Sequence, residues 1–310
     1  MSYYRQENRR SRLTAGQDGN ALITLIAIQL VIFILLAFIK VIYYFSYNKG
    51  DVALDAYQNS ILQWVTLPAN LSTFITRPWT LITHMFVHDN VWHIVANMLW
   101  LWAFGYILQD LAGNKKIIPI FLYGALAGAL AYMISFNVIP VLRQYIDIPA
   151  LGASAGVMGI AIATTVMAPG YRIFPFINGG IPLWVLTMIF VIIDLATIPY
   201  NNPGGHIAHL AGGAMGFLFI VMMRKGYDWG LWMNNVYDWV NNLFNPDKPK
   251  KGKRIKTELF YKSSTKPYNK TSNITQQRVD DILDKINQKG YNSLTDDEKE
   301  LLKRASKEDI

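Results

Sequence analysis

Long apolar runs separated by short polar segments dominate the chain up to about residue 225. Five stretches contain no Asp, Glu, Lys or Arg: 21–39, 117–142, 148–171, 173–193 and 195–223. A helix needs about 20 mostly apolar residues to cross a bilayer. The runs also lack the alternating polarity of transmembrane barrel strands. They therefore predict membrane-spanning helices.

The fold class that follows is an all-α polytopic membrane protein with a six-helix bundle, because lipid admits only helices and closed barrels. The predicted spans lie near 20–46, 92–110, 117–139, 153–169, 180–198 and 205–224. Composition agrees, since 52% of residues are hydrophobic and only 16% are charged. This balance argues against a soluble core of the same helices.

Basic residues indicate the orientation, because Lys and Arg are enriched on the cytoplasmic side. They gather before the first span and after the second, fourth and sixth spans: Arg5, Arg9, Arg10, Arg12, Lys115, Lys116, Arg172, Arg224 and Lys225. Both termini are therefore expected in the cytoplasm, with the protein in the inner (plasma) membrane. No cleavable signal peptide is expected. The net charge of +8 fits this asymmetry rather than nucleic-acid binding.

The chain divides into five predicted parts. They are a cytoplasmic N-terminal segment (1–19), a membrane domain (20–225), an interfacial amphipathic helix (226–245), a basic flexible linker (246–276) and a C-terminal helical hairpin (277–310). In the hairpin, Thr295 followed by Glu298 is typical of a helix capping box. In the first loop, roughly 47–91, Pro68 and Pro78 are expected to separate short helices.

Polar residues inside the apolar runs carry the candidate chemistry, because each costs free energy in a membrane and faces the bundle interior. Ser154 lies in a Gly-x-Ser-x-Gly sequence at the start of the fourth span. His93 and Asn97 share a helix face near the start of the second span, and His206 and His209 lie at the start of the sixth. In the predicted topology all these helix starts lie at the outer face.

This set of side chains matches the needs of serine-protease chemistry. Ser154 becomes a nucleophile when an adjacent base takes its proton, and His209 is the candidate base. His93, Asn97 and the Ser154 backbone N–H are candidate donors to an oxyanion. We expect Asp147 and Asp194 to be the only acidic residues near these helix starts, which favours a Ser–His dyad. No cofactor or metal is expected.

Each feature taken alone has a simpler interpretation. A Gly-x-Ser-x-Gly sequence is more often a helix-packing site than a nucleophile. A single buried His or Asn can simply hydrogen-bond between helices. Gly212-x-x-x-Gly216 and Gly124-x-x-x-Gly128 are predicted packing motifs. Only the conjunction of these groups at one depth favours catalysis.

The residues resemble the rhomboid family of intramembrane serine proteases across roughly 70–225. Three motifs carry the resemblance: His88-x4-His93-x3-Asn97, Gly152-Ala153-Ser154, and Ala208-His209-x2-Gly212-x3-Gly216. The resemblance implies a six-helix core, a Ser154–His209 dyad and an oxyanion site from His93 and Asn97. It also implies transmembrane protein substrates, cut near the outer end of their helix, and no cofactor. The hairpin resembles tails of bacterial rhomboids of the Bacteroidetes type.

Several residues have possible accessory roles, namely His88, Gly152, Met158, Asp194 and His206. Met158 stands where many rhomboids carry an aromatic residue that packs on the histidine. Asp194 could orient a catalytic histidine, pair with His206 or be hydrated in a cavity. His206 could also face the site, but the Gly212–Gly216 spacing favours His209 as the base.

Other functions remain as alternatives. A catalytically inactive rhomboid-like protein would bind membrane proteins without cutting them, although such relatives generally lack the serine or the histidine. A transporter would also place His, Asn and Asp inside its helices, but no convincing internal repeat supports it. The sequence leaves the natural substrate and the oligomeric state open.

Overall fold

The computed structural model describes residues 20–174, 179–241 and 276–306. The chain forms two compact units, residues 1–246 and 247–310, which are described separately. The predicted N-terminal segment (1–19) and nearly all of the predicted linker (246–276) lie outside the described residues.

Six apolar helices build the described part of the first unit, which confirms the all-α membrane fold. They are α1 (Ala21–Ser46), α5 (Val91–Ala112), α6 (Ile117–Val138), α7 (Ser154–Met167), α8 (Leu183–Thr197) and α9 (Pro203–Arg224). Four of them are long and apolar enough to cross a membrane: α1, α5, α6 with the turn before it, and α9.

The other two apolar helices, α7 and α8, are shorter, with 14 and 15 residues. Their helical bounds fall inside the predicted spans 153–169 and 180–198. Helix α8 starts later than the predicted span because Ile181–Pro182 form strand β2, which pairs with β1 (Arg172–Ile173). The helix therefore begins only after Pro182. At 1.5 Å per residue, α7 is about 21 Å long, less than the roughly 30 Å hydrocarbon core of a bilayer.

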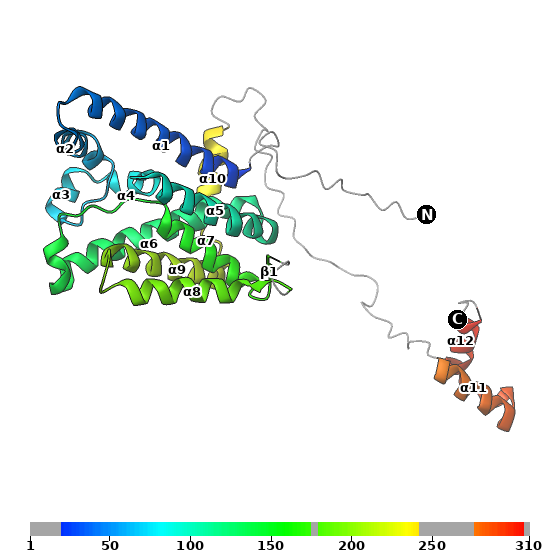
Figure 1. Ribbon diagram of the computed structural model, residues 1–310. Coiled ribbons are helices and arrows are strands. Elements are labelled where there is room, and N and C mark those ends of the chain that lie inside the picture. The colour runs from blue at the N-terminus through cyan, green and yellow to red at the C-terminus, as the bar shows by residue number, and fades with distance from the viewer. Residues whose placement is uncertain (1–19, 175–178, 242–275, 307–310) are drawn as a thin grey trace. The chain divides into compact units, whose positions relative to one another are not determined.

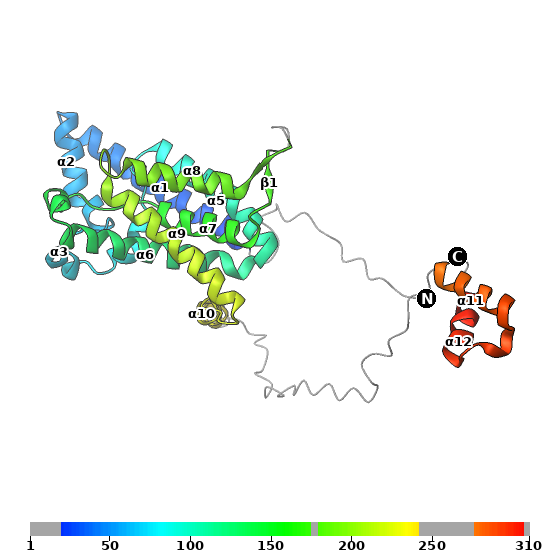
Figure 2. The same ribbon diagram turned by 90° about the horizontal axis from the view of Figure 1, so that it is seen from below.

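Helix α7 lies among α5, α6, α8 and α9 and packs against all four (Figure 1 and Figure 2). Glycines allow the close approach. A Cβ on Gly212 of α9 would lie 2.1 Å from the Ala155 carbonyl oxygen, and one on Gly216 would lie 2.0 Å from the Gly159 carbonyl oxygen. The packing interpretation of Gly212-x-x-x-Gly216 is therefore confirmed.

The interior of the bundle is apolar, and so is much of its outer surface. The largest buried side chains include Phe104, Phe121 and Phe219. Outward-facing residues of α1 and α8 are also apolar, for example Phe38, which is 65% exposed. An apolar exterior of this kind is suited to lipid rather than to water.

The first loop folds into short helices, α2 (Gly50–Ser60), η1 (Leu62–Trp64), α3 (Leu71–Thr76), α4 (Thr80–Thr83) and η2 (His84–Phe86). The Trp64 and Trp79 rings stack with centroids 6.1 Å apart, and the Arg77 guanidinium lies 4.4 Å from the Trp64 ring. Leu67 and Ala150 exchange backbone hydrogen bonds of 2.8 and 2.9 Å. This loop therefore supports the segment that leads to Ser154.

After α9 the chain continues into α10 (Leu231–Asn241), part of the predicted interfacial helix. The segment before it returns to α6, where the Tyr123 hydroxyl donates to the Trp229 carbonyl and accepts from the Trp232 indole. Lys116 also forms an ion pair with Asp228. The exposed face of α10 carries apolar side chains such as Trp232 and Trp239, a pattern typical of membrane interfaces.

The second unit contains α11 (Gln276–Lys289), η5 (Tyr291–Ser293) and α12 (Asp296–Ala305). Ile282, Leu294 and Leu301 form its small core. The predicted capping box is confirmed. The Glu298 backbone N–H donates to the Thr295 hydroxyl at 3.4 Å, and the Glu298 carboxylate accepts from the Thr295 backbone N–H at 2.8 Å.

Candidate active site

Ser154 is the first residue of α7, and the two residues before it set its position. Gly152 has φ of +116°, which a residue with a side chain rarely adopts. Its N–H donates to the His84 carbonyl at 2.9 Å. A Cβ at Gly152 would lie 2.8 Å from His93 Nε2. A glycine here therefore permits both the turn into α7 and the close approach of His93.

Ser154 Oγ and His209 Nε2 lie 2.7 Å apart, within hydrogen-bonding distance. These residues are 55 positions apart in sequence and belong to α7 and α9. The direct backbone contact between Gly212 and Ala155, described above, holds the two helices at this spacing. The structure thus brings together the predicted nucleophile and the predicted base.

Asp194 of α8 contacts both histidines of α9. Its Oδ1 lies 3.0 Å from His209 Nδ1 and 2.7 Å from His206 Nδ1. The carboxylate is buried, with 5% of the residue exposed. The sequence left the place of Asp194 open, and the structure places it in line with His209 and Ser154.

His93 and Asn97 lie one turn apart on α5. His93 Nε2 lies beside Gly152, as described above. The Asn97 amide is buried and donates to the His93 carbonyl at 3.1 Å. The His93 ring is therefore close to the start of α7, where Ala153 provides no side-chain cap to the first helical N–H groups. Such N–H groups have no partner within the helix and can donate to an anion.

Asp89 is a site residue that the sequence reasoning missed. The expectation that Asp147 and Asp194 are the only acidic residues near these helix starts is wrong, because Asp89 Oδ1 lies 2.9 Å from His93 Nδ1. Burial raises the pKa of Asp89, but the hydrogen bond and charge of His93 outweigh it and lower the pKa below its usual value. The i, i+4 spacing of Asp89 and His93 across the helix start was the available signal.

His84 and His88, in the loop before α5, are buried. Burial lowers the pKa of both to about 4, helped at His88 by the nearby His93. Both rings are therefore neutral near pH 7. His88 packs edge-on against His93 with ring centroids 5.0 Å apart, and neither of its nitrogens has a hydrogen-bond partner among the described residues. His88 thus supports the His93 ring through packing.

Met158 lies on α7 one turn after Ser154 and is buried. Its Cγ would contact a Cβ placed on Gly213 of α9 at 3.2 Å. It therefore fills the space between α7 and α9 one turn beyond the serine, a position suited to a flexible apolar side chain.

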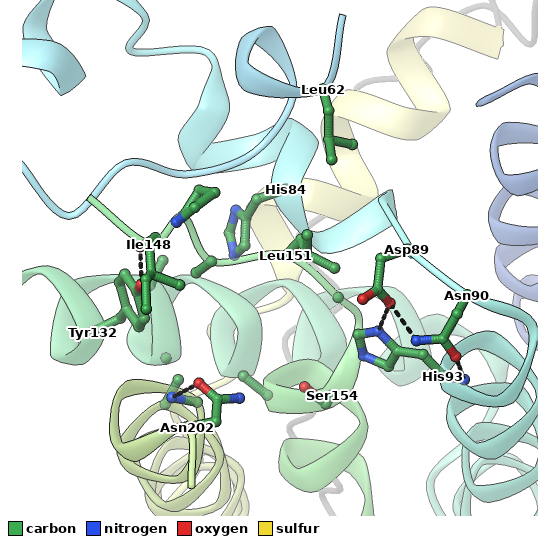
Figure 3. Close-up of a pocket in the computed structure, with 18 of the residues that line it drawn as sticks. Leu62, His84, Asp89, Asn90, His93, Tyr132, Ile148, Leu151, Ser154 and Asn202 are labelled. Carbon is green, nitrogen blue, oxygen red and sulfur yellow. Dashed lines mark hydrogen bonds and ion pairs between the residues drawn. The ribbon is translucent and has the colours of Figure 1, made fainter. Parts of the chain in front are cut away.

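A cavity of about 700 Å³ opens above Ser154 (Figure 3). Ser154 and His93 border it, with Asp89 and Asn90 beside His93. Its wall combines apolar and polar groups from α1, the first loop, α6, the segment before α7 and the start of α9, including Lys40, Tyr57, His84, Tyr132, Leu151, Asn202 and Gly205. The cavity is large enough for several residues of an extended peptide.

Asp194, His206 and His209 also offer ligand atoms within 4.8 Å of one another, a spacing compatible with a metal ion. The hydrogen bonds among these three residues account for the same arrangement without a metal ion. Each ring needs only a proton on Nδ1 to donate to the carboxylate, and both rings can do so in their neutral form. We therefore interpret the three residues as a hydrogen-bonded network.

Comparison with known proteins shows which sequences this chain is similar to. Residues 76–226 match the family described as "Rhomboid domain", and residues 265–308 match a family of unknown function, DUF6576. The chain is 29% identical over 157 residues to "Rhomboid protein 1, mitochondrial" of Saccharomyces cerevisiae, covering 47% of this chain and 42% of that protein.

Two further relatives are also similar to part of this chain. "RHOMBOID-like protein 12, mitochondrial" of Arabidopsis thaliana is 28% identical, covering 48% of each chain. "Rhomboid protease GluP" of Bacillus subtilis is 24% identical over 219 residues, covering 67% of this chain and 36% of that protein. The chain thus spans less than half the length of these curated relatives.

Proposed function

Since the chain belongs to the rhomboid family of membrane proteins, we propose that it is an intramembrane serine endopeptidase. It hydrolyses a peptide bond near the outer end of a substrate's transmembrane helix. The observation that carries the proposal is the 2.7 Å contact between Ser154 Oγ and His209 Nε2 inside an apolar helix bundle. The name of the Bacillus subtilis relative, a rhomboid protease, supports the same reaction class.

The reaction begins with attack of Ser154 Oγ on the scissile carbonyl carbon. His209 Nε2 accepts the serine proton as the C–O bond forms. The protonated His209 then donates to the leaving amine, and the peptide C–N bond breaks. Water, with His209 again as the base, hydrolyses the resulting ester and restores Ser154.

The oxyanion formed during attack needs donors that are already in place. The side chains of His93 and Asn97, with the backbone N–H of Ser154, supply them. The position of His93 beside Gly152, at the start of α7, supports this role, and Asn97 lies one turn from His93 on α5 and donates to its carbonyl.

Water and substrate reach the site by different routes. Helix α7 is shorter than a bilayer is thick, so its two ends cannot both reach the membrane surfaces. With Ser154 at the outward end, the cavity above it admits water from the outer face. The substrate helix approaches laterally between α5 and α8, where Trp100 contacts Phe190 edge-on at 4.4 Å. Both termini of this chain then lie in the cytoplasm and the protein in the plasma membrane, as the basic residues indicate.

Cleavage of a reporter protein with one transmembrane helix, by purified protein in liposomes, tests the proposal. Ser154→Ala and His209→Ala are each expected to abolish cleavage, because the nucleophile or its base is lost. Cleavage that survives Ser154→Ala contradicts the mechanism. A wild-type protein that binds several reporters, cuts none and resists a fluorophosphonate at Ser154 would instead favour the inactive rhomboid-like binding protein.

A further inference from the structure

The hydrogen bonds around Asp194 determine which tautomer His209 adopts. A carboxylate oxygen only accepts, so His209 Nδ1, 3.0 Å from Asp194 Oδ1, must carry the proton. In neutral His209 the Nε2 atom is then an acceptor. That atom lies 2.7 Å from Ser154 Oγ, so the serine hydroxyl donates to it. This is the tautomer that a general base for Ser154 requires.

The charge of Asp194 also favours the imidazolium that forms on His209 during the reaction. The carboxylate is buried, with 5% of the residue exposed, so its interaction with a nearby cation is weakly screened by water. Its Oδ2 atom has no hydrogen-bond partner among the described residues. The polar contacts of the group are therefore concentrated on Oδ1, which faces the two histidines.

His206 contacts the same oxygen of this carboxylate as His209. Its Nδ1 lies 2.7 Å from Asp194 Oδ1 and 3.3 Å from the Thr197 hydroxyl. Because His206 and His209 are three residues apart on α9, they approach Asp194 from adjacent positions on one helix face. His206 thus anchors the carboxylate without contacting Ser154.

We propose that Asp194 is a positioning residue that orients His209 and stabilises its protonated form, which extends the predicted Ser–His dyad to a Ser154–His209–Asp194 relay. His206 is the anchor of Asp194. No proton passes to Asp194: the proton of Ser154 moves only to His209 Nε2, and the Nδ1 proton stays on the ring. This inference rests on the proposed protease function.

Kinetics of Asp194→Asn test the relay. An Asn keeps the size of the side chain but removes its charge. The turnover number kcat is expected to fall about 10- to 100-fold, corresponding to the loss of a hydrogen bond to a charged group, while KM stays within about twofold. The acid limb of the kcat/KM profile is expected to move to lower pH, because without the carboxylate a proton binds His209 less readily.

Two control variants separate positioning from simple tethering of α8 to α9. His206→Gln removes the other α8–α9 contact of Asp194, and it is expected to lower kcat far less than Asp194→Asn and to leave the acid limb in place. Asp147→Asn changes an exposed aspartate that borders a different cavity, and it is expected to behave as wild type. Equal losses in Asp194→Asn and His206→Gln, with no shift of the acid limb, would overturn the relay.

A measurement on the wild-type fold covers the case in which Asp194→Asn does not fold. Nitrogen NMR of histidine-labelled protein, with the His209 signals assigned by their absence in His209→Gln, reports the tautomer directly. A proton on Nδ1 of neutral His209 supports the relay, and a proton on Nε2 overturns it. The proposed protease function is contradicted by a different result, namely that wild type shows no cleavage that depends on Ser154. If wild type cleaves and Asp194→Asn matches it, only the relay fails.

Discussion

Gly212→Ala is the substitution whose effect follows most directly from the helix packing. Gly212 lies on α9, one turn after His209, and faces the backbone of α7 next to Ser154. A Cβ at this position would lie 2.1 Å from the Ala155 carbonyl oxygen, 2.8 Å from its carbon and 3.0 Å from its Cα. All three atoms belong to the backbone, so no side-chain rotation can relieve the clash.

The size of the clash sets the expected loss. Real Cβ atoms essentially never approach another heavy atom closer than 3.0 Å, so α7 and α9 must separate by about 1 Å. The same displacement would lengthen the 2.7 Å contact between Ser154 and His209 to about 3.7 Å, beyond a hydrogen bond. A misplacement of about 1 Å can cost 100-fold in rate, and overpacking destabilises a fold by about 1–3 kcal/mol.

The assay compares Gly212→Ala with Gly213→Ala, its neighbour on the same helix. A Cβ at Gly213 would meet only side-chain atoms, Ile162 Cγ1 at 3.1 Å and Met158 Cγ at 3.2 Å, which can move by a few tenths of an ångström. We expect Gly212→Ala to lose about 100-fold in kcat and to unfold at a lower temperature, and Gly213→Ala to stay near wild type. Equal activity and equal thermal stability in the two variants would refute the packing argument.

Four further predictions concern the oxyanion site, the buried histidines, metal dependence and the C-terminal unit. Asn97→Ala is expected to lower kcat about 100-fold with little change in KM, because an oxyanion donor is lost; an unchanged kcat would exclude Asn97 from that role. The free energy of unfolding is expected to fall as pH drops from 6.5 toward 4, by about 1.4 kcal/mol per pH unit for each of His84 and His88. In this range the two histidines are protonated in the unfolded chain but stay neutral in the folded protein. In pH-dependent unfolding measurements, His84→Gln should halve this slope. A chelator such as EDTA is expected to leave cleavage unchanged, whereas inactivation reversed by added Zn²⁺ would assign Asp194, His206 and His209 to a metal. The pKa of Glu298 is lowered from 4.5 to about 2 by its hydrogen bonds to Lys285 and Thr295, so its stabilisation of α12 is complete above pH 4.5 and is lost as pH falls toward 2. The protection factors of the α12 amides, which correct for the pH dependence of intrinsic exchange, should fall over that window in wild type but not in Glu298→Gln.

The sequence alone predicted the apolar helices, because they depend on short-range patterns, and it named the residues of the candidate site. Charge-free runs long enough to cross a bilayer identify the apolar helices without any tertiary information. His93 and Asn97 could be assigned to one helix face because they are four residues apart. Ser154 and His209 could be paired by their common depth at helix starts, and the structure places them 2.7 Å apart.

Other features depended on contacts between distant segments. The lengths of α7 and α8 could not be read from the apolar runs, because hydrophobicity continues past the helix ends into the β1–β2 hairpin. The backbone of Leu67 and His84 forms hydrogen bonds with the segment just before Ser154. These bonds could not be predicted from residue types, since all residues carry the same backbone groups.

The roles of the two site aspartates show where sequence reasoning ends. Asp89 pairs with His93 four residues later, so its i, i+4 spacing was readable but was overlooked. Asp194 is different, because it lies on α8 while His206 and His209 lie on α9, and helical periodicity relates residues only within one helix. The sequence therefore determined which residues could serve a serine hydrolase. Only the packing of α8 against α9 decided that one buried carboxylate faces the Nδ1 atoms of two histidines, and so which nitrogen of His209 is free to face Ser154.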